Sequence, residues 1–311
     1  MNKYPLSMIF AAALAFAACT NDNEPDTPDN GPVAAQVNAS IEGTMTRASG
    51  TQWATDDCIG ISTVTDGLTQ YENVPYRYNG IVFSPADDAI YYQDAQEQVE
   101  FKAYYPFGGT AFFIIPTSIE ATTSADYQTA EKQPEIDFLF AEGAIASKAN
   151  PTVNFTGDHA FRHCMSQITL TFIEGSDMSF RGSLTGYTLK GLKLSGEFKP
   201  SDGTTQTKEE ATDLGITLSD VETENVNGEN QYTVSPVILF PQDMGGKIEL
   251  EVTVDRQTYK ATLTIPGSKS ALEAGNNYTW PVTVSKTGMS VGQAEIKVWK
   301  PVQGEGTTAT M

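Results

Sequence analysis

Apolar residues recur at every second position along most of the chain after residue 34. This period of two is typical of half-buried strands, whose successive side chains point to opposite faces of a sheet. Leu189, Leu192 and Leu194 follow the pattern less regularly. The regular alternation predicts antiparallel strands at Val37, Ala39 and Ile41; Val99, Phe101, Ala103 and Tyr105; Ile168, Leu170 and Phe172; Ile248, Leu250, Val252 and Val254; Tyr259, Ala261, Leu263 and Ile265; and Tyr278, Trp280, Val282 and Val284.

Turn signals such as Asn79-Gly80, Asn227-Gly228 and Gly245-Gly246 separate these segments. No stretch carries a helical apolar stripe over twelve residues. The pattern therefore predicts an all-β fold, most simply two antiparallel β-sandwich domains.

The predicted domains cover residues 34–156 and 157–311. Turn residues between 148 and 158 bracket a short predicted strand, Val153 to Phe155, and mark the boundary. The polar segment 201–231 is expected to be a long exposed loop with short strand pieces.

The first residues are typical of an export signal. Lys3 precedes an apolar run from Met8 to Ala18, and eleven residues are too few to span a bilayer. Residues 1–18 are therefore predicted to be a signal peptide. Cys19 follows two alanines, as in the lipobox of bacterial lipoproteins, which predicts acylation of its thiol; an ordinary cleaved secretory peptide is the alternative.

Residues 19–33 are acidic and rich in proline, which predicts a solvated, disordered tether. A calcium loop is the alternative interpretation of the Asp and Asn residues there. The segment lacks the spaced Asp-x-Asp-x-Asp-Gly pattern and the distal Glu of such a loop.

The net charge of the chain excludes two kinds of binding. The 311 residues include 19 Lys+Arg and 39 Asp+Glu, so the net charge is −20. A strongly acidic field repels polyanions, which excludes nucleic-acid binding and also membrane binding through a basic face. The 40% hydrophobic content is enough for folded cores.

Residues that could carry catalysis are few. His159 and His163 lie four apart but without the Glu of a His-Glu-x-x-His motif, and a structural role is favoured over a metal site. Cys58 and Cys164 could pair in an oxidising compartment or remain as two buried free thiols. The chain has no glycine-rich phosphate loop and no Cys-His pair in a familiar catalytic context, so no enzyme and no cofactor are predicted.

Several sequence motifs, in this order, resemble the fimbrillin family, the subunits of type V pili. They are the lipobox at Cys19, Thr46-Arg47, Trp53-Ala54-Thr55-Asp56-Asp57, Val99 to Pro106, Asp137-Phe138-Leu139-Phe140-Ala141, Phe161 to Ile168, and Gly275 to Val284. The resemblance covers essentially the whole chain.

The resemblance implies two tandem transthyretin-like β-sandwiches in an outer-membrane lipoprotein, held to the membrane through its lipid anchor only. An arginine-specific protease would cut between Arg47 and Ala48, and the mature chain would join a surface fimbria that supports adhesion. Removal of the first strand, with Val37, Ala39 and Ile41, would leave a groove for another subunit to fill.

The candidate donor strand carries Ala294, Ile296 and Val298. Alternatively, this segment is simply the last strand of its own sandwich. The expected partners are other fimbrial subunits, in a homo- or hetero-polymer, and a host surface protein or glycan. The alternative function is a monomeric lipid-anchored adhesin or glycan-binding module, and the stalk, anchor and tip roles all stay open.

Overall fold

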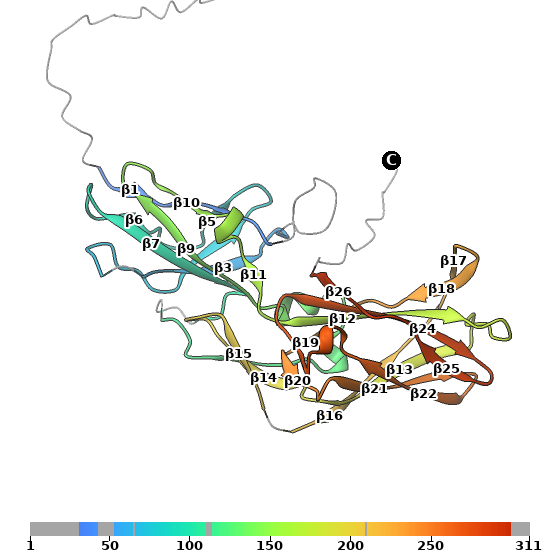
Figure 1. Cartoon of the computed structure of the whole chain (residues 1–311). Helices are drawn as coiled ribbons and strands as arrows, with labels where there is room; N and C mark the ends of the chain where they lie inside the picture. Colours follow the sequence, from blue (N-terminus) through green and yellow to red (C-terminus); the bar gives the residue numbers. More distant parts are fainter. Residues whose placement is uncertain (1–30, 43–52, 65, 110–113, 209, 300–311) are drawn as a thin grey trace, which may run out of the picture. The chain divides into compact units, whose positions relative to one another are not determined.

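Nearly all of the regular secondary structure is β-strand in the computed structural model of the chain, which describes residues 31–42, 53–64, 66–109, 114–208 and 210–299 (Figure 1). The chain divides into two units, Met1–Pro32 and Val33–Met311, and the second contains all the described strands. The described helical segments are the four-residue α1 (Gln133–Ile136) and the 3-10 turns Ala125–Tyr127, Gly157–His159 and Pro266–Ser268. At the described residues, no helix has the length and apolar character needed to cross a membrane.

The first large sheet has eight strands around a core rich in aromatic residues. Its order is β10 (Thr152–Phe155), β2 (Gln36–Ala39), β5 (Phe83–Pro85), β4 (Val74–Tyr78), β3 (Cys58–Thr63), β7 (Gln98–Tyr105), β9 (Leu139–Ser147) and β11 (Arg162–His163). The long strands β7 and β9 run side by side (Figure 1). A separate pair joins β1 (Val33–Ala34) to β6 (Tyr91–Tyr92).

Two further sheets enclose a second core. One contains β17 (Glu224–Val226), β18 (Glu229–Thr233), β12 (Ser166–Glu174), β24 (Asn276–Ser285) and β25 (Gly288–Val291), with β19 (Val237–Leu239) on β12 and β26 (Glu295–Val298) on β24. The other contains β16 (Thr212–Thr217), β13 (Leu184–Leu192), β21 (Lys247–Val254) and β22 (Gln257–Thr264). Small sheets add β15 (Thr204–Thr207), β14 (Ser195–Lys199) and β8 (Ile119–Thr122), and β20 (Gln242–Asp243) with β23 (Ala271–Leu272).

The strands predicted from strict alternation are confirmed as β7, β12, β21, β22 and β24. The irregular spacing of the leucines also has a structural basis, because the register of β13 against β16 shifts between Leu189 and Leu192. Alternation arises from burial of one face, so it predicts strands where a core covers that face.

One expectation is corrected: the sheets are not purely antiparallel, because β2 pairs in parallel with β10, and β12 with β24. Segment 201–231 is mostly exposed and contains the short strands expected there, which are β15, β16, β17 and the start of β18. Leu214 of β16 is 1% exposed and Ile216 packs against the same second core, so two apolar side chains anchor this otherwise polar strand.

The division into domains at residues 156 and 157 stays a prediction. Strand β8, from before that point, pairs with β14 from after it, and β11 pairs back with β9. A third buried cluster likewise combines side chains from both segments, among them Tyr104, Phe138, Phe198 and Trp299.

Candidate functional site

The first strand, β2, is an interior strand of the eight-stranded sheet. It pairs with β10 over four residues and with β5 through Val37 opposite Phe83. Backbone bonds to the β10 side lie at both ends of the strand: Gln36 N donates to Pro151 O at 3.0 Å, and Ser40 N donates to Phe155 O at 2.9 Å. At the described residues β10 pairs with β2 alone, so loss of β2 would expose an unpaired edge.

One face of this strand fills the first core. Val37 is 3% exposed and Ile41 is 7% exposed, and Ala39 between them packs against the same core. Asn38, on the other face, is exposed and donates from Nδ2 to Oδ1 of Asn154 at 3.1 Å. The three residues predicted for the first strand therefore all contribute to the interior.

Trp53 lies next to Ala39 in the first core. Its indole Nε1 donates to the carbonyl oxygen of Ala39 at 3.0 Å. Its ring lies edge-on to Phe83 and to Phe161, at 5.1 Å in each case. Phe83 is the pairing partner of Val37 and Phe161 that of Ile41, so the indole packs against the cross-strand neighbours of both large side chains.

Arg47 and Ala48 lie outside the described residues, as does Cys19. Segment 43–52, which carries the predicted cleavage site, connects Glu42 to Trp53. Glu42 N donates to Phe161 O at 2.8 Å, and Trp53 is bonded to Ala39, so both ends of the connection are attached to the first strand and its neighbours.

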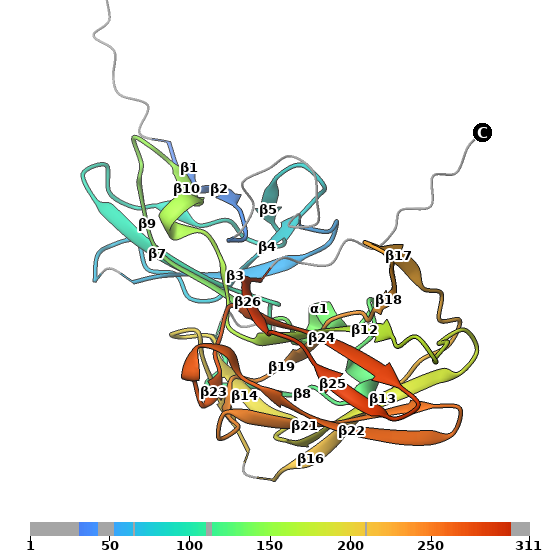
Figure 2. The same ribbon diagram turned by 45° about the vertical axis from the view of Figure 1, so that its right-hand side comes forward.

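The last described strand, β26, lies at the edge of β24, and β25 pairs further along the same strand (Figure 2). Ala294 packs against the second core, whereas Ile296 is 37% exposed. Val298 belongs to the strand by its backbone pairing with Asn276, and its side chain lies outside the described residues. The three candidate donor residues thus lie in or next to an edge strand of their own sheet.

Trp299 fixes the end of this strand. Its ring is 1% exposed and stacks on the imidazole of His163, with the ring centroids 4.2 Å apart and the planes at 4°. Nδ1 of His163 lies 2.8 Å from Oδ1 of Asp137, and its buried Nε2 has no hydrogen-bond partner among the residues that the structure describes. The sequence shows only that Trp299 follows the alternating residues, and this contact between residues 136 positions apart was missed.

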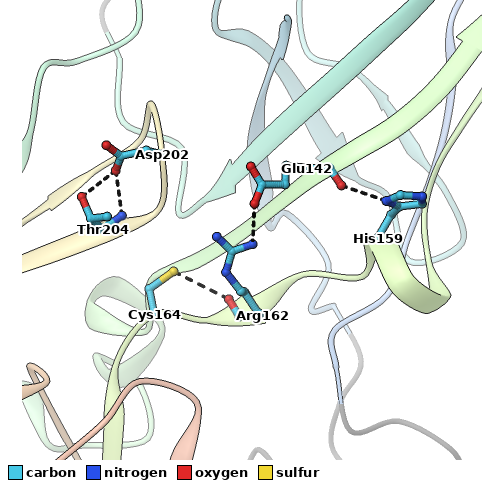
Figure 3. A network of polar contacts seen from close by, with 6 residues as sticks. All are labelled: Glu142, His159, Arg162, Cys164, Asp202 and Thr204. Carbon is cyan, nitrogen blue, oxygen red and sulfur yellow. Dashed lines mark hydrogen bonds and ion pairs between the residues drawn. The ribbon is translucent and has the colours of Figure 1, made fainter.

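His159 and Arg162 meet at one strand of the first sheet (Figure 3). Nδ1 of His159 lies 3.0 Å from the carbonyl oxygen of Glu142, whose carboxylate pairs with Arg162 at 3.2 Å. The guanidinium of Arg162 also lies over the ring of Phe140 at 4.8 Å. These contacts hold the connection between β10 and β12 against β9, which is a structural role. No group of three His, Cys, Asp or Glu residues suited to a metal ion occurs in the part of the chain that the structure describes.

A hairpin turn nearby contains a second polar contact, also shown in Figure 3. Oδ1 of Asp202 accepts hydrogen bonds from the hydroxyl and the backbone N–H of Thr204, at 2.6 and 2.9 Å. The hydrogen bond from the Thr204 side chain, above all, lowers the pKa of the Asp202 carboxyl. This turn is attached to β7, since Nζ of Lys102 donates to Ser201 O at 2.9 Å.

Cys58 and Cys164 are both free thiols. Burial raises the pKa of Cys58, and burial raises the pKa of Cys164 to about 12. Sγ of Cys164 lies 3.8 Å from Arg162 O (Figure 3). Of the two alternatives left open by the sequence, the structure has the unpaired thiols.

Alkylation tests this state of the cysteines. In a Cys19→Ser variant at pH 8, iodoacetamide is expected to label Cys58 slowly and Cys164 more slowly still, because only about one Cys164 in ten thousand is a thiolate at four pH units below its pKa. Unfolding in urea should make both react fully. Two thiols that stay unlabelled in urea until a reductant is added would show a disulfide.

The sequence is similar to a known protein family and to a named fimbrial protein. The model of a family described as "Fimbrillin-like" matches residues 46–299, a range that begins next to Arg47 and leaves the first strand outside. A Bacteroides uniformis protein named "Putative fimbrium subunit Fim1C" is 26% identical over 320 residues, 99% of each chain.

Two solved structures are also similar to the chain. A structure named "putative cell adhesion protein" from Bacteroides ovatus is 28% identical, with a TM-score of 0.65 over 86% of this chain and 96% of that one. One of the same description from Bacteroides uniformis is 21% identical, with a TM-score of 0.64 over 86% of this chain and 99% of that one, and it shows the shared fold.

Proposed function

Because the chain belongs to the fimbrillin-like family of structural fimbrial subunits, we propose that it is a subunit of a cell-surface fimbria assembled by donor-strand exchange. It is exported as a precursor lipidated at Cys19 and is held to the outer membrane by that lipid. An arginine-specific protease cuts between Arg47 and Ala48, which separates the lipid from the body of the protein. The body is a pair of transthyretin-like sandwiches that supports adhesion.

The observation that carries this proposal is the position of the first strand. It fills the core with Val37 and Ile41, yet it precedes the predicted cleavage site. Burial of two such side chains contributes about 3–6 kcal/mol together, which an isolated groove would lose. A strand from a neighbouring subunit would restore both the apolar contacts and the pairing of β10.

The candidate donor to the next subunit is the segment with Ala294, Ile296 and Val298. Its strand lies at a sheet edge and pairs on one side only, with β24, in the described part of the chain. An edge strand breaks fewer backbone bonds on release than an interior strand does. Its release would also withdraw Trp299 from its stack on His163.

The test is a comparison of two arginine variants in the cells that make the protein. Arg47→Gln should keep the chain in the lipid-anchored membrane fraction and remove it from sheared fimbriae, whereas Arg256→Gln, at an exposed turn, should behave as the wild type. Incorporation of the Arg47→Gln chain into fimbriae at the wild-type level would contradict the proposal.

The same experiment separates the alternative function. A monomeric lipid-anchored adhesin or glycan-binding module would stay in the membrane fraction in the wild type too. A host surface protein or glycan would then be its partner as a monomer, with the first strand still in place.

A further inference from the structure

The first strand shows which side chains its groove accepts. The inward residues are Ala35, Val37, Ala39 and Ile41, of which Ala39 is partly exposed and the other three are buried, so a small residue lies between two large ones. We infer that this groove selects donor strands with a small residue in the middle, and that the donor comes from a different subunit and not from a second copy of this chain. The inference rests on the proposed strand exchange and names the partner that it requires.

Trp53 sets the small central position. Its indole bonds the backbone of Ala39 and contacts Phe83 on one side and Phe161 on the other. Trp53 is 8% exposed, and Phe161 is fully buried. Ala39 is partly exposed, so a larger side chain in its place would either crowd this packed indole or turn toward solvent, and both changes lose core packing.

Trp53 also stays with the protein after the proposed cleavage, because it follows Arg47 in the sequence. The groove therefore keeps its narrow centre when the first strand leaves. The two outer positions stay lined by Phe83 and Phe161, which face Val37 and Ile41 in the intact sheet.

The candidate donor segment of this chain has a different pattern. Its alternate residues are Ala294, Ile296 and Val298, preceded by Gly292. Shifting the register of this segment by two residues does not produce the order large, small and large. Its other face carries the charged residues Glu295 and Lys297, so turning the strand over does not produce that order either. Reversing the direction of the donor does not produce the order large, small and large either.

One later segment of the sequence has a small central residue, with Thr307, Ala309 and Met311. In either direction a threonine hydroxyl would enter one of the two apolar outer positions. Burial of a hydroxyl in an apolar site without a hydrogen-bond partner is unfavourable, so this segment is a weaker match than a strand with two aliphatic residues.

The partner is thus an extended segment with Val, Ile or Leu at the outer inward positions and Gly, Ala or Ser at the centre. Its outward residues are polar, since Asn38 occupies the exposed face and bonds Asn154. This chain would in turn donate its strand to a subunit whose groove has a wider centre.

Peptide exchange into the full-length chain, cut after Arg47, tests the selection. A fluorescent copy of residues 35–42 reports occupancy by anisotropy, and unlabelled peptides compete with it. The 35–42 copy should compete at least about tenfold better than the same peptide with Ala39→Leu. The peptide of residues 292–299 should compete about tenfold worse than its version with Ala294→Val and Ile296→Ala, which has the large, small, large pattern.

Equal competition by the two 292–299 peptides, or tight binding of the Ala39→Leu peptide, would overturn the selection rule. Self-association of the cut chain, measured by size-exclusion chromatography, would overturn the requirement for a different subunit. Inhibition of that self-association by a peptide of residues 303–311 would identify the segment with Thr307, Ala309 and Met311 as the donor. If the 35–42 copy itself never enters the cut chain, strand exchange fails as a whole, and the proposed function fails with it.

Discussion

Replacing Trp53 with alanine is expected to lower the free energy of unfolding by about 3–5 kcal/mol, the usual range for removal of a buried tryptophan. The indole contacts three aromatic rings, those of Phe83, Tyr105 and Phe161, within 5.5 Å. It also donates the hydrogen bond that holds Ala39. Urea denaturation measures the loss, and the cut chain should release its first strand faster.

The control is Ile81→Ala, which removes an apolar side chain that is 83% exposed and should change the stability by less than about 0.5 kcal/mol. Trp53→Phe should lie between the two, because it keeps an aromatic ring but loses the indole hydrogen bond. A Trp53→Ala protein as stable as Ile81→Ala would show that Trp53 does not hold the first strand.

Replacing Trp299 with alanine should release the last strand. The side chain is 1% exposed and stacks on His163, and its backbone N–H donates to Gly275 O at 3.2 Å. Removal of such a ring costs about 3–5 kcal/mol. Among the described residues β26 pairs along one edge only, so this loss should appear mainly as local opening, with the amide hydrogens of β26 exchanging on the order of 100-fold faster.

Ile296→Ala is the matched control within the same strand. Its side chain is 37% exposed, so we expect a smaller change in exchange than for Trp299→Ala, below about tenfold. Unchanged exchange of residues 295–298 in Trp299→Ala would show that the backbone ladder alone holds the strand. Hydrogen exchange followed by mass spectrometry separates these outcomes.

The sequence predicted the strands well where one face is buried along its whole length. In β7 and β24, alternate residues enter the core, and the pattern is therefore visible without knowledge of any partner. The pairing of strands is not encoded in this local pattern. The parallel contact of β2 with β10 joins residues 116 positions apart, and nothing in either strand alone specifies its direction.

For the first strand, the sequence predicted the alternating residues but not the packing around them. Its three alternating residues were recognised, and the structure places all of them toward the first core. The role of Trp53 was not recognised, because its place beside Ala39 depends on Phe83 and Phe161 from distant strands. The histidines are similar: the sequence favoured a structural role but not its partners, and His159 lies in a 3-10 turn and His163 in β11, with different contacts.

Native mass spectrometry of the full-length chain tests the central claim, that the first strand is a replaceable part of the fold. After cleavage at Arg47, the amino-terminal fragment should stay bound until a peptide copy of residues 35–42 is added in excess. The account predicts that the cut chain then loses the fragment and gains one peptide, one for one, while it remains folded. A fragment that never leaves, or a chain that unfolds when the fragment does, would contradict it.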